Sequence, residues 1–165
     1  MRIATLLFLL CATASEAQAD WSLAAFTGAS RTPSNTLTLV GPDGVPNRIG
    51  PVDYVGEAWR APMYYGYRIG WARAERGLGV EVEFTHAKAI ATTHSTLLTD
   101  FQQSHGLNFV LANIVWRHPV AAGRLVLAAR GGAGFTIPHV EGTYRGTHTE
   151  SYQYGGLAWH AGAGV

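Results

Sequence analysis

Four residues that could carry chemistry lie where strand-length segments give way to long connections: His86, His105, His139 and Glu141. Because antiparallel neighbours bring such ends together, we expect these side chains at one rim of a sheet. Imidazole and carboxylate groups gathered in this way bind divalent metal ions or transfer protons. The spacing matches no compact metal-binding motif, so the alternative is that each histidine caps a connection or lies at a membrane boundary.

Six segments with the two-residue side-chain period of β-strands would position these residues. They are Trp21–Gly28, Pro62–Ala72, Leu78–Ala87, Leu107–Arg117, Arg124–Ile137 and Tyr152–Val165. Short connections, Arg73–Gly77 and His118–Gly123, alternate with long ones that we expect to be loops, namely Ala29–Ala61, Lys88–Gly106 and Pro138–Ser151. Tight turns at one end and long loops at the other are the connectivity of an outer-membrane β-barrel.

The two faces of these strands differ sharply in chemistry. In the third segment Val80 and Val82 share one face, while Glu81 and Glu83 share the other. The glycine-rich faces of other segments carry further ionisable groups that we expect to pair with these carboxylates inside a narrow lumen: Arg68, Arg130 and His160. A soluble, lipocalin-like barrel would instead place its apolar face inside, and these inward residues would form a poor apolar pocket. Lipid is therefore the expected solvent of the apolar face.

The first 19 residues have the pattern of a secretory signal peptide. Arg2 supplies the positive end, Ile3–Ala14 the apolar run, and Ala17–Ala19 a small-residue cleavage pattern. Cleavage before Asp20 would leave residues 20–165 as the mature domain, without Cys11, the chain's one cysteine. Disulfides and a thiol nucleophile are then excluded. The formal charge of +1 comes without a basic run, so no nucleic-acid partner is expected.

Bacterial single-chain barrels have an even number of strands, about eight at the least. The sequence offers about six, and Val165 falls within a strand-like pattern. We therefore expect an all-β, antiparallel, up-and-down transmembrane barrel of eight strands, incomplete at its C-terminus. A final hairpin of roughly forty residues would supply the remainder.

Several rim segments resemble the lipid A oxidase family of outer-membrane proteins. The resembling stretches are Asp20–Gly28, Trp59–Gly66, Phe84–Lys88, Gly106–Asn108 and Pro138–Glu141. The resemblance implies an eight-stranded barrel that oxidises the proximal glucosamine of lipid A to 2-aminogluconate. Dioxygen would be consumed and hydrogen peroxide released. A divalent cation is implied, and no organic cofactor is expected.

The resemblance also implies where the site lies, because its segments fall at the outer rim of the expected barrel. Candidate catalytic residues are His86, His139 and Glu141. Candidate substrate-binding residues are Lys88, Asn108, Arg60 and Tyr64, and candidate metal ligands are His86, His105 and His139. The expected partner is lipid A, or lipopolysaccharide, and the expected protein is a monomer in the bacterial outer membrane.

Two features leave other interpretations open. His86 and Lys88 have the parity of the lipid-facing residues in their strand, so they are expected to face lipid headgroup phosphates. The pairs His94-Ser95 and Ser104-His105 could instead suggest a lipid A deacylase, although no third triad member is evident. A non-catalytic barrel, structural or adhesive, would act through Ala29–Ala61.

Overall fold

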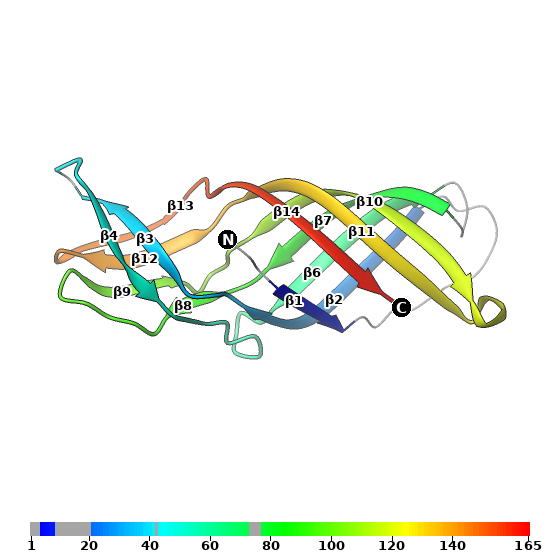
Figure 1. The fold of residues 1–165 in the computed structure, drawn as a ribbon, viewed down its shortest axis with the longest axis horizontal. Helices are drawn as coiled ribbons and strands as arrows, with labels where there is room; N and C mark the ends of the chain where they lie inside the picture. The colour runs from blue at the N-terminus through cyan, green and yellow to red at the C-terminus, as the bar shows by residue number, and fades with distance from the viewer. Residues whose placement is uncertain (1–3, 9–20, 42, 73–76) are drawn as a thin grey trace.

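The computed structural model describes residues 4–8, 21–41, 43–72 and 77–165, and its main element is a curled antiparallel sheet (Figure 1). The seven strands of this sheet lie in the order β1-β2-β6-β7-β10-β11-β14. Their bounds are β1 Ala4–Phe8, β2 Trp21–Arg31, β6 Tyr65–Ala72, β7 Gly77–His86, β10 Phe109–Val120, β11 Leu125–Thr136 and β14 Gly156–Gly164. We call this element the barrel sheet.

The six strands expected from the sequence are all present, each within a few residues of its predicted bounds. Each pairs antiparallel with the next, from Trp21↔Trp71 between β2 and β6 to Thr136↔Gly156 between β11 and β14. The short connection after β10 contains one 3-10 turn, Ala121–Gly123. The other short connection, residues 73–76, lies outside the described residues, as does the predicted cleavage site. Ala4–Phe8, within the predicted signal peptide, pairs with β2.

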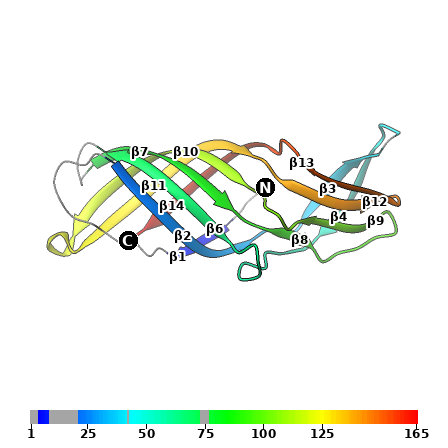
Figure 2. The ribbon, with the colours of Figure 1, turned by 180° about the vertical axis from the view of Figure 1, so that it is seen from behind.

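The three long connections are not the loops that the sequence predicted, because each of them contains β-strands. A five-stranded sheet has the order β13-β12-β9-β8-β5, and β3 pairs with β4 in a hairpin. The bounds are β3 Asn35–Val40, β4 Pro46–Val52, β5 Tyr54–Val55, β8 Ala89–Ala91, β9 Leu98–Gln103, β12 His139–Tyr144 and β13 Thr147–Tyr152. Pairing between connections satisfies backbone groups that isolated loops would leave to water. We call these strands the extension; they project beyond one end of the barrel sheet (Figure 2).

The barrel sheet has its apolar side chains outside and its charged side chains inside. On β7, Val82 is 54% exposed whereas Glu83 is 4% exposed, and on β10 Ile114 is 62% exposed whereas Asn113 is 3% exposed. The same alternation runs along β6, β11 and β14. This is the polarity that the sequence predicted, and it is the reverse of that of a soluble barrel.

Among the strands described, β14 pairs only with β11 and β1 only with β2, so the barrel sheet is an open half-barrel. A closed barrel of eight strands is thus not formed by the described residues. The part of the chain that the structure describes holds no helix long and apolar enough to cross a membrane.

Glycine on the inner face of β11 lets β10 and β11 approach closely. A Cβ atom on Gly134 would collide with the backbone of Val110 and Leu111. We expect Gly134→Ala to destabilise the fold by about 1–3 kcal/mol, since an overpacked site must move backbone. The matched control is Gly131→Ala on the outer face, where the nearest atom lies 3.8 Å away. Equal urea midpoints for the two variants would contradict this packing.

Candidate functional site

Four segments far apart in the sequence meet where the barrel sheet joins the extension, at a place we call the rim. The Leu107 amide donates to the Ala87 carbonyl over 2.6 Å, and the His139 amide donates to the Gly106 carbonyl over 2.8 Å. Asn108 forms two hydrogen bonds with Ile137. Its backbone carbonyl accepts from the Ile137 amide, and its side-chain amide donates to the Ile137 carbonyl. The backbone itself therefore holds these segments together.

A small apolar core anchors the fourth segment, which precedes β6. Phe26, Ala58, Tyr64 and Ala87 form a buried cluster, with Phe109 packed against it. The Thr27 hydroxyl donates to the carbonyl of Tyr64 over 2.7 Å. The segments predicted to lie at the outer rim thus contact one another, together with β2.

His86 occupies the centre of the rim and is almost fully buried, at 4% exposure. Its Nδ1 lies 3.0 Å from Oδ1 of Asn108, an acceptor, which assigns the imidazole proton to Nδ1. Its ring stacks on Tyr65 with centroids 4.9 Å apart. The Nε2 atom is buried without a hydrogen-bond partner among the described residues. His86 therefore presents a free lone pair beneath the rim.

Gly106 makes the close contact with His86 geometrically possible. Its φ of 117° lies in a region that other residues rarely adopt, and a Cβ there would collide with Asn108 and lie 2.6 Å from Nδ1 of His86. A side chain at this position would displace the imidazole.

Lys88 does not face outward, contrary to the parity prediction. It is 3% exposed, and its ammonium donates to the carbonyl oxygens of Arg60 and Ala61 over 2.7 and 3.4 Å. His86 is also buried, but it keeps the face that its parity predicts, because it pairs with Tyr65 and stacks on its ring. Parity fails for Lys88 because the segment before β6 folds over the end of β7. Lys88 therefore ties that segment to the rim.

The remaining substrate-binding candidates point in different directions. The side chain of Arg60 is mostly exposed and pairs with Glu57 at 3.2 Å. Tyr64 is 2% exposed and lines the cavity inside the barrel sheet. Burial, with a smaller contribution from the Glu83 carboxylate, raises the pKa of Tyr64 to about 12. The phenol is therefore a neutral hydrogen-bond donor at neutral pH.

His105 and His139 lie together beside the rim. Their ring centroids are 5.1 Å apart, and Nε2 of His139 lies 3.7 Å from Oε1 of Glu150. Glu141 is on the same strand as His139, two residues on, opposite Glu150 across the β12–β13 pair. A carboxylate beside an imidazole orients the ring for proton transfer.

The predicted metal ligands do not form a ready-made centre. Within the described ranges, no three His, Cys, Asp or Glu side chains are grouped closely enough to hold a metal ion. His86 is bonded to Asn108, whereas His139 faces Glu150. The divalent cation that the resemblance implies thus does not fit these residues as they are arranged.

The serine–histidine pairs of the deacylase alternative have ordinary local roles. The Ser95 hydroxyl accepts hydrogen bonds from the amides of Leu97 and Leu98, as in a turn. Ser104 contacts the ring of its chain neighbour His105 over 3.2 Å, and both are side chains of one exposed turn. Neither arrangement supplies an orienting carboxylate for the imidazole.

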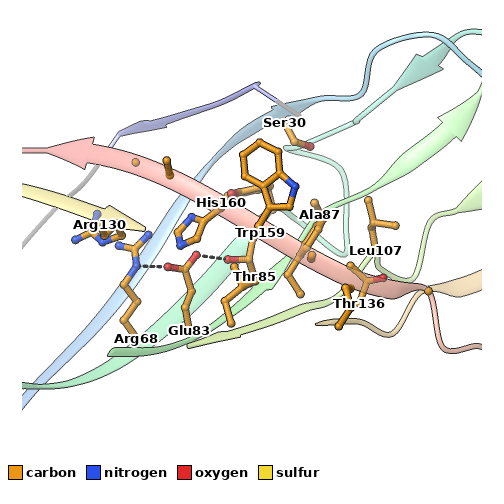
Figure 3. A pocket seen from close by; sticks show the side chains of 18 of the residues that line it. Ser30, Arg68, Glu83, Thr85, Ala87, Leu107, Arg130, Thr136, Trp159 and His160 are labelled. Carbon is orange, nitrogen blue, oxygen red and sulfur yellow. Dashed lines mark hydrogen bonds and ion pairs between the residues drawn. The ribbon is translucent and has the colours of Figure 1, made fainter. Parts of the chain in front are cut away.

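Below the rim, the lumen holds the ion pairs that the sequence predicted. Glu83 accepts hydrogen bonds from Arg68 Nε (2.7 Å), Thr85 Oγ1 (2.8 Å) and Asn113 Nδ2 (3.3 Å). Asn113 Oδ1 in turn accepts from His160 Nε2 over 2.7 Å. Figure 3 shows Arg68, Glu83, Thr85 and His160 around the same cavity.

A second carboxylate in the lumen, that of Glu81, forms ion pairs with two arginines. Glu81 accepts from Arg117 over 3.0 Å and from Arg130 over 3.1 Å. Arg117 also donates to Ser22 on β2, which ties strands on two parts of the sheet together. The sequence singled out Arg130 as a partner but did not anticipate that Arg117 shares Glu81.

Glu150 is the rim residue that sequence reasoning missed. It lies in Pro138–Ser151, which was predicted to be a loop, but Tyr144↔Thr147 pairing closes a hairpin around the two-residue turn Arg145-Gly146. The glycine at the second turn position, flanked by the β-branched and aromatic residues Thr143, Tyr144 and Thr147, was the available signal. The strand pairing then places Glu150 diagonally opposite His139.

Comparisons with protein-family models, with curated proteins and with solved structures find no match to this chain. The contacts at the rim and in the lumen are therefore the basis on which a function can be proposed.

Proposed function

We propose that the barrel sheet is the wall of a closed, eight-stranded barrel in the bacterial outer membrane. The reversed polarity of the sheet supports this, because exposed Val82 and Ile114 need an apolar solvent. The length of the strands also fits a membrane-spanning barrel. β10 and β11 have 12 residues each. Strands of that length, tilted by about 45°, span roughly 28 Å, and the apolar band of such barrels is about 25 Å tall.

We further propose that the rim acts on lipid A and oxidises its proximal glucosamine to 2-aminogluconate. The observation that carries this proposal is the convergence of the separate segments that resemble lipid A oxidases. His86, Asn108 and His139 come from three of them and meet through Gly106 and Ile137. In the proposed barrel this cluster lies just beyond the lipid-facing surface, at the depth of lipid A sugars.

Oxidation of the glucosamine requires a group at the rim that accepts a proton. Oxidation removes two electrons and two protons from the C1 hemiacetal, reduces dioxygen to hydrogen peroxide and yields a lactone, which water opens to the acid. His139 is the best-placed acceptor, since it is less enclosed than His86 and Glu150 lies beside it. His86 and Lys88, both buried, then serve as positioning residues that hold the rim segments.

The test is mass spectrometry of lipid A from cells with and without the intact gene. The proposal expects a gain of one oxygen atom that depends on the gene and on dioxygen. Loss of an acyl chain would select the deacylase instead. Unchanged lipid A would select the structural or adhesive barrel.

A single substitution sharpens this test. We expect His139→Phe to lower the rate of lipid A oxidation by the purified full-length protein by about a hundredfold, the lower end of what proton-transfer groups contribute. Phenylalanine keeps the aromatic contacts with Tyr152 and His105, whose centroids lie 4.6 and 5.1 Å away. Ser104→Ala is the control and should leave oxidation unchanged. Full activity of folded His139→Phe protein would overturn the role of His139.

A further inference from the structure

A cavity of about 510 Å³ lies along the inner face of the barrel sheet, opens at the free edge of β14 and is lined in part by the charged network. Its lining changes character along the strands. The end near the rim carries the apolar side chains of Ala87 and Leu107 beside Thr136, and the deeper end carries Arg68, Arg130 and His160 (Figure 3). Phe109 is a further apolar residue of the lining. A cavity of this volume is in the range that holds small ligands.

The charges at the deep end do not balance. Two guanidinium groups, those of Arg68 and Arg130, line the cavity together with one carboxylate, that of Glu83. All three side chains are at most 7% exposed. A surplus positive charge in a buried network favours an anion nearby.

Hydrogen-bond donors remain available in the same place. The bonds formed among described residues use only the Nε atoms of Arg68 and Arg130, and both residues line the cavity. Arg68 is held in place from behind by the ring of Phe26, whose centroid lies 3.9 Å from its Cζ. The neutral Tyr64 hydroxyl, also on the cavity wall, makes no hydrogen bond with the described residues.

We propose that this cavity binds an anionic amphiphile, an alkyl carboxylate, with its headgroup against Arg130 and Arg68 and its tail toward Leu107 and Phe109. The charge surplus selects an anion, and the apolar walls select a ligand with a hydrocarbon tail. The site is separate from the sugar chemistry proposed at the rim and does not depend on it.

The experiment titrates octanoate, labelled with ¹³C at its carboxyl carbon, into the full-length protein in non-ionic detergent micelles. We expect a saturable shift of the carboxyl resonance and nuclear Overhauser contacts between the tail and Leu107. Octanoate should bind at least about tenfold more tightly than octanol, since a hydrogen bond to a charged group contributes about 1.5–3 kcal/mol. Acetate, which lacks the tail, should bind more weakly than octanoate.

Two variants that each remove one arginine from Glu81 provide the matched comparison. Arg130→Gln, at the cavity wall, should weaken octanoate binding about tenfold or more. Arg117→Gln should leave it within about threefold, because Arg117 does not line the cavity. Equal affinities for octanoate and octanol in the unaltered protein would overturn the proposal, and this comparison needs no variant. Equal losses in the two variants would also overturn it.

Discussion

Replacing Glu83 with alanine is expected to destabilise the folded protein by about 3–5 kcal/mol, the usual result of removing one partner from a buried ion pair. Glu83 accepts three hydrogen bonds, and its partner Arg68 is only 4% exposed. Without the carboxylate, the Arg68 guanidinium keeps its charge inside the lumen. The measurement is the urea midpoint of unfolding for protein in lipid vesicles.

Two further variants test whether the loss of stability comes from the burial of the Arg68–Glu83 ion pair or from the loss of any ion pair. Glu57→Ala breaks an exposed ion pair with Arg60 and should cost less than about 1 kcal/mol. The double variant Arg68→Met/Glu83→Leu should recover most of the stability lost in Glu83→Ala, because no unpaired charge remains. A Glu83→Ala variant as stable as Glu57→Ala would mean that the lumen is wet and the network exposed.

Replacing Val82 with arginine is expected to cost about 2–4 kcal/mol in vesicles, the penalty for a charge on the lipid face near the bilayer centre. Val82 lies on the outer face of β7 and pairs with Ile69 and Ala112, so lipid is the only solvent it would meet in the proposed barrel. In water the same change at an exposed site would be nearly neutral.

Val40→Arg is the matched control. Val40 is exposed to a similar degree, but it lies on β3 in the extension, where water is the expected solvent. Its replacement should alter stability by less than about 0.5 kcal/mol. Equal costs at Val82 and Val40 would contradict the membrane placement.

The barrel strands could be predicted because their alternation is strict and covers many residues. On β7 the glutamates lie on one face and the valines on the other, so the alternation alone distinguishes the inner face from the outer face. The extension was missed because its strands are short and polar; β13, Thr147–Tyr152, is exposed at every residue. Such strands form by pairing within one connection, as β13 does with β12, or between connections, as β12 does with β9, and the second kind of pairing leaves no local signal in the sequence.

The rim was predictable only in part. Adjacent strand ends do bring His86, Asn108 and His139 into one region, as antiparallel pairing requires. The burial of Lys88 was not predictable, since it depends on the segment before β6 folding back so that Lys88 can bond the carbonyl of Arg60. Parity holds within a strand and gives no information once a neighbouring connection covers its end.

Tryptophan quenching by brominated lipid tests the orientation of the barrel sheet most directly. Trp21 and Trp116 lie on its outer face, on β2 and β10, whereas Trp59 is exposed in the segment before β6. In single-tryptophan variants refolded into vesicles, we expect bromolipid to quench Trp21 and Trp116, and aqueous iodide to quench Trp59. Iodide quenching of Trp21 and Trp116, with no effect of bromolipid, would show that water covers the apolar face and would contradict the account.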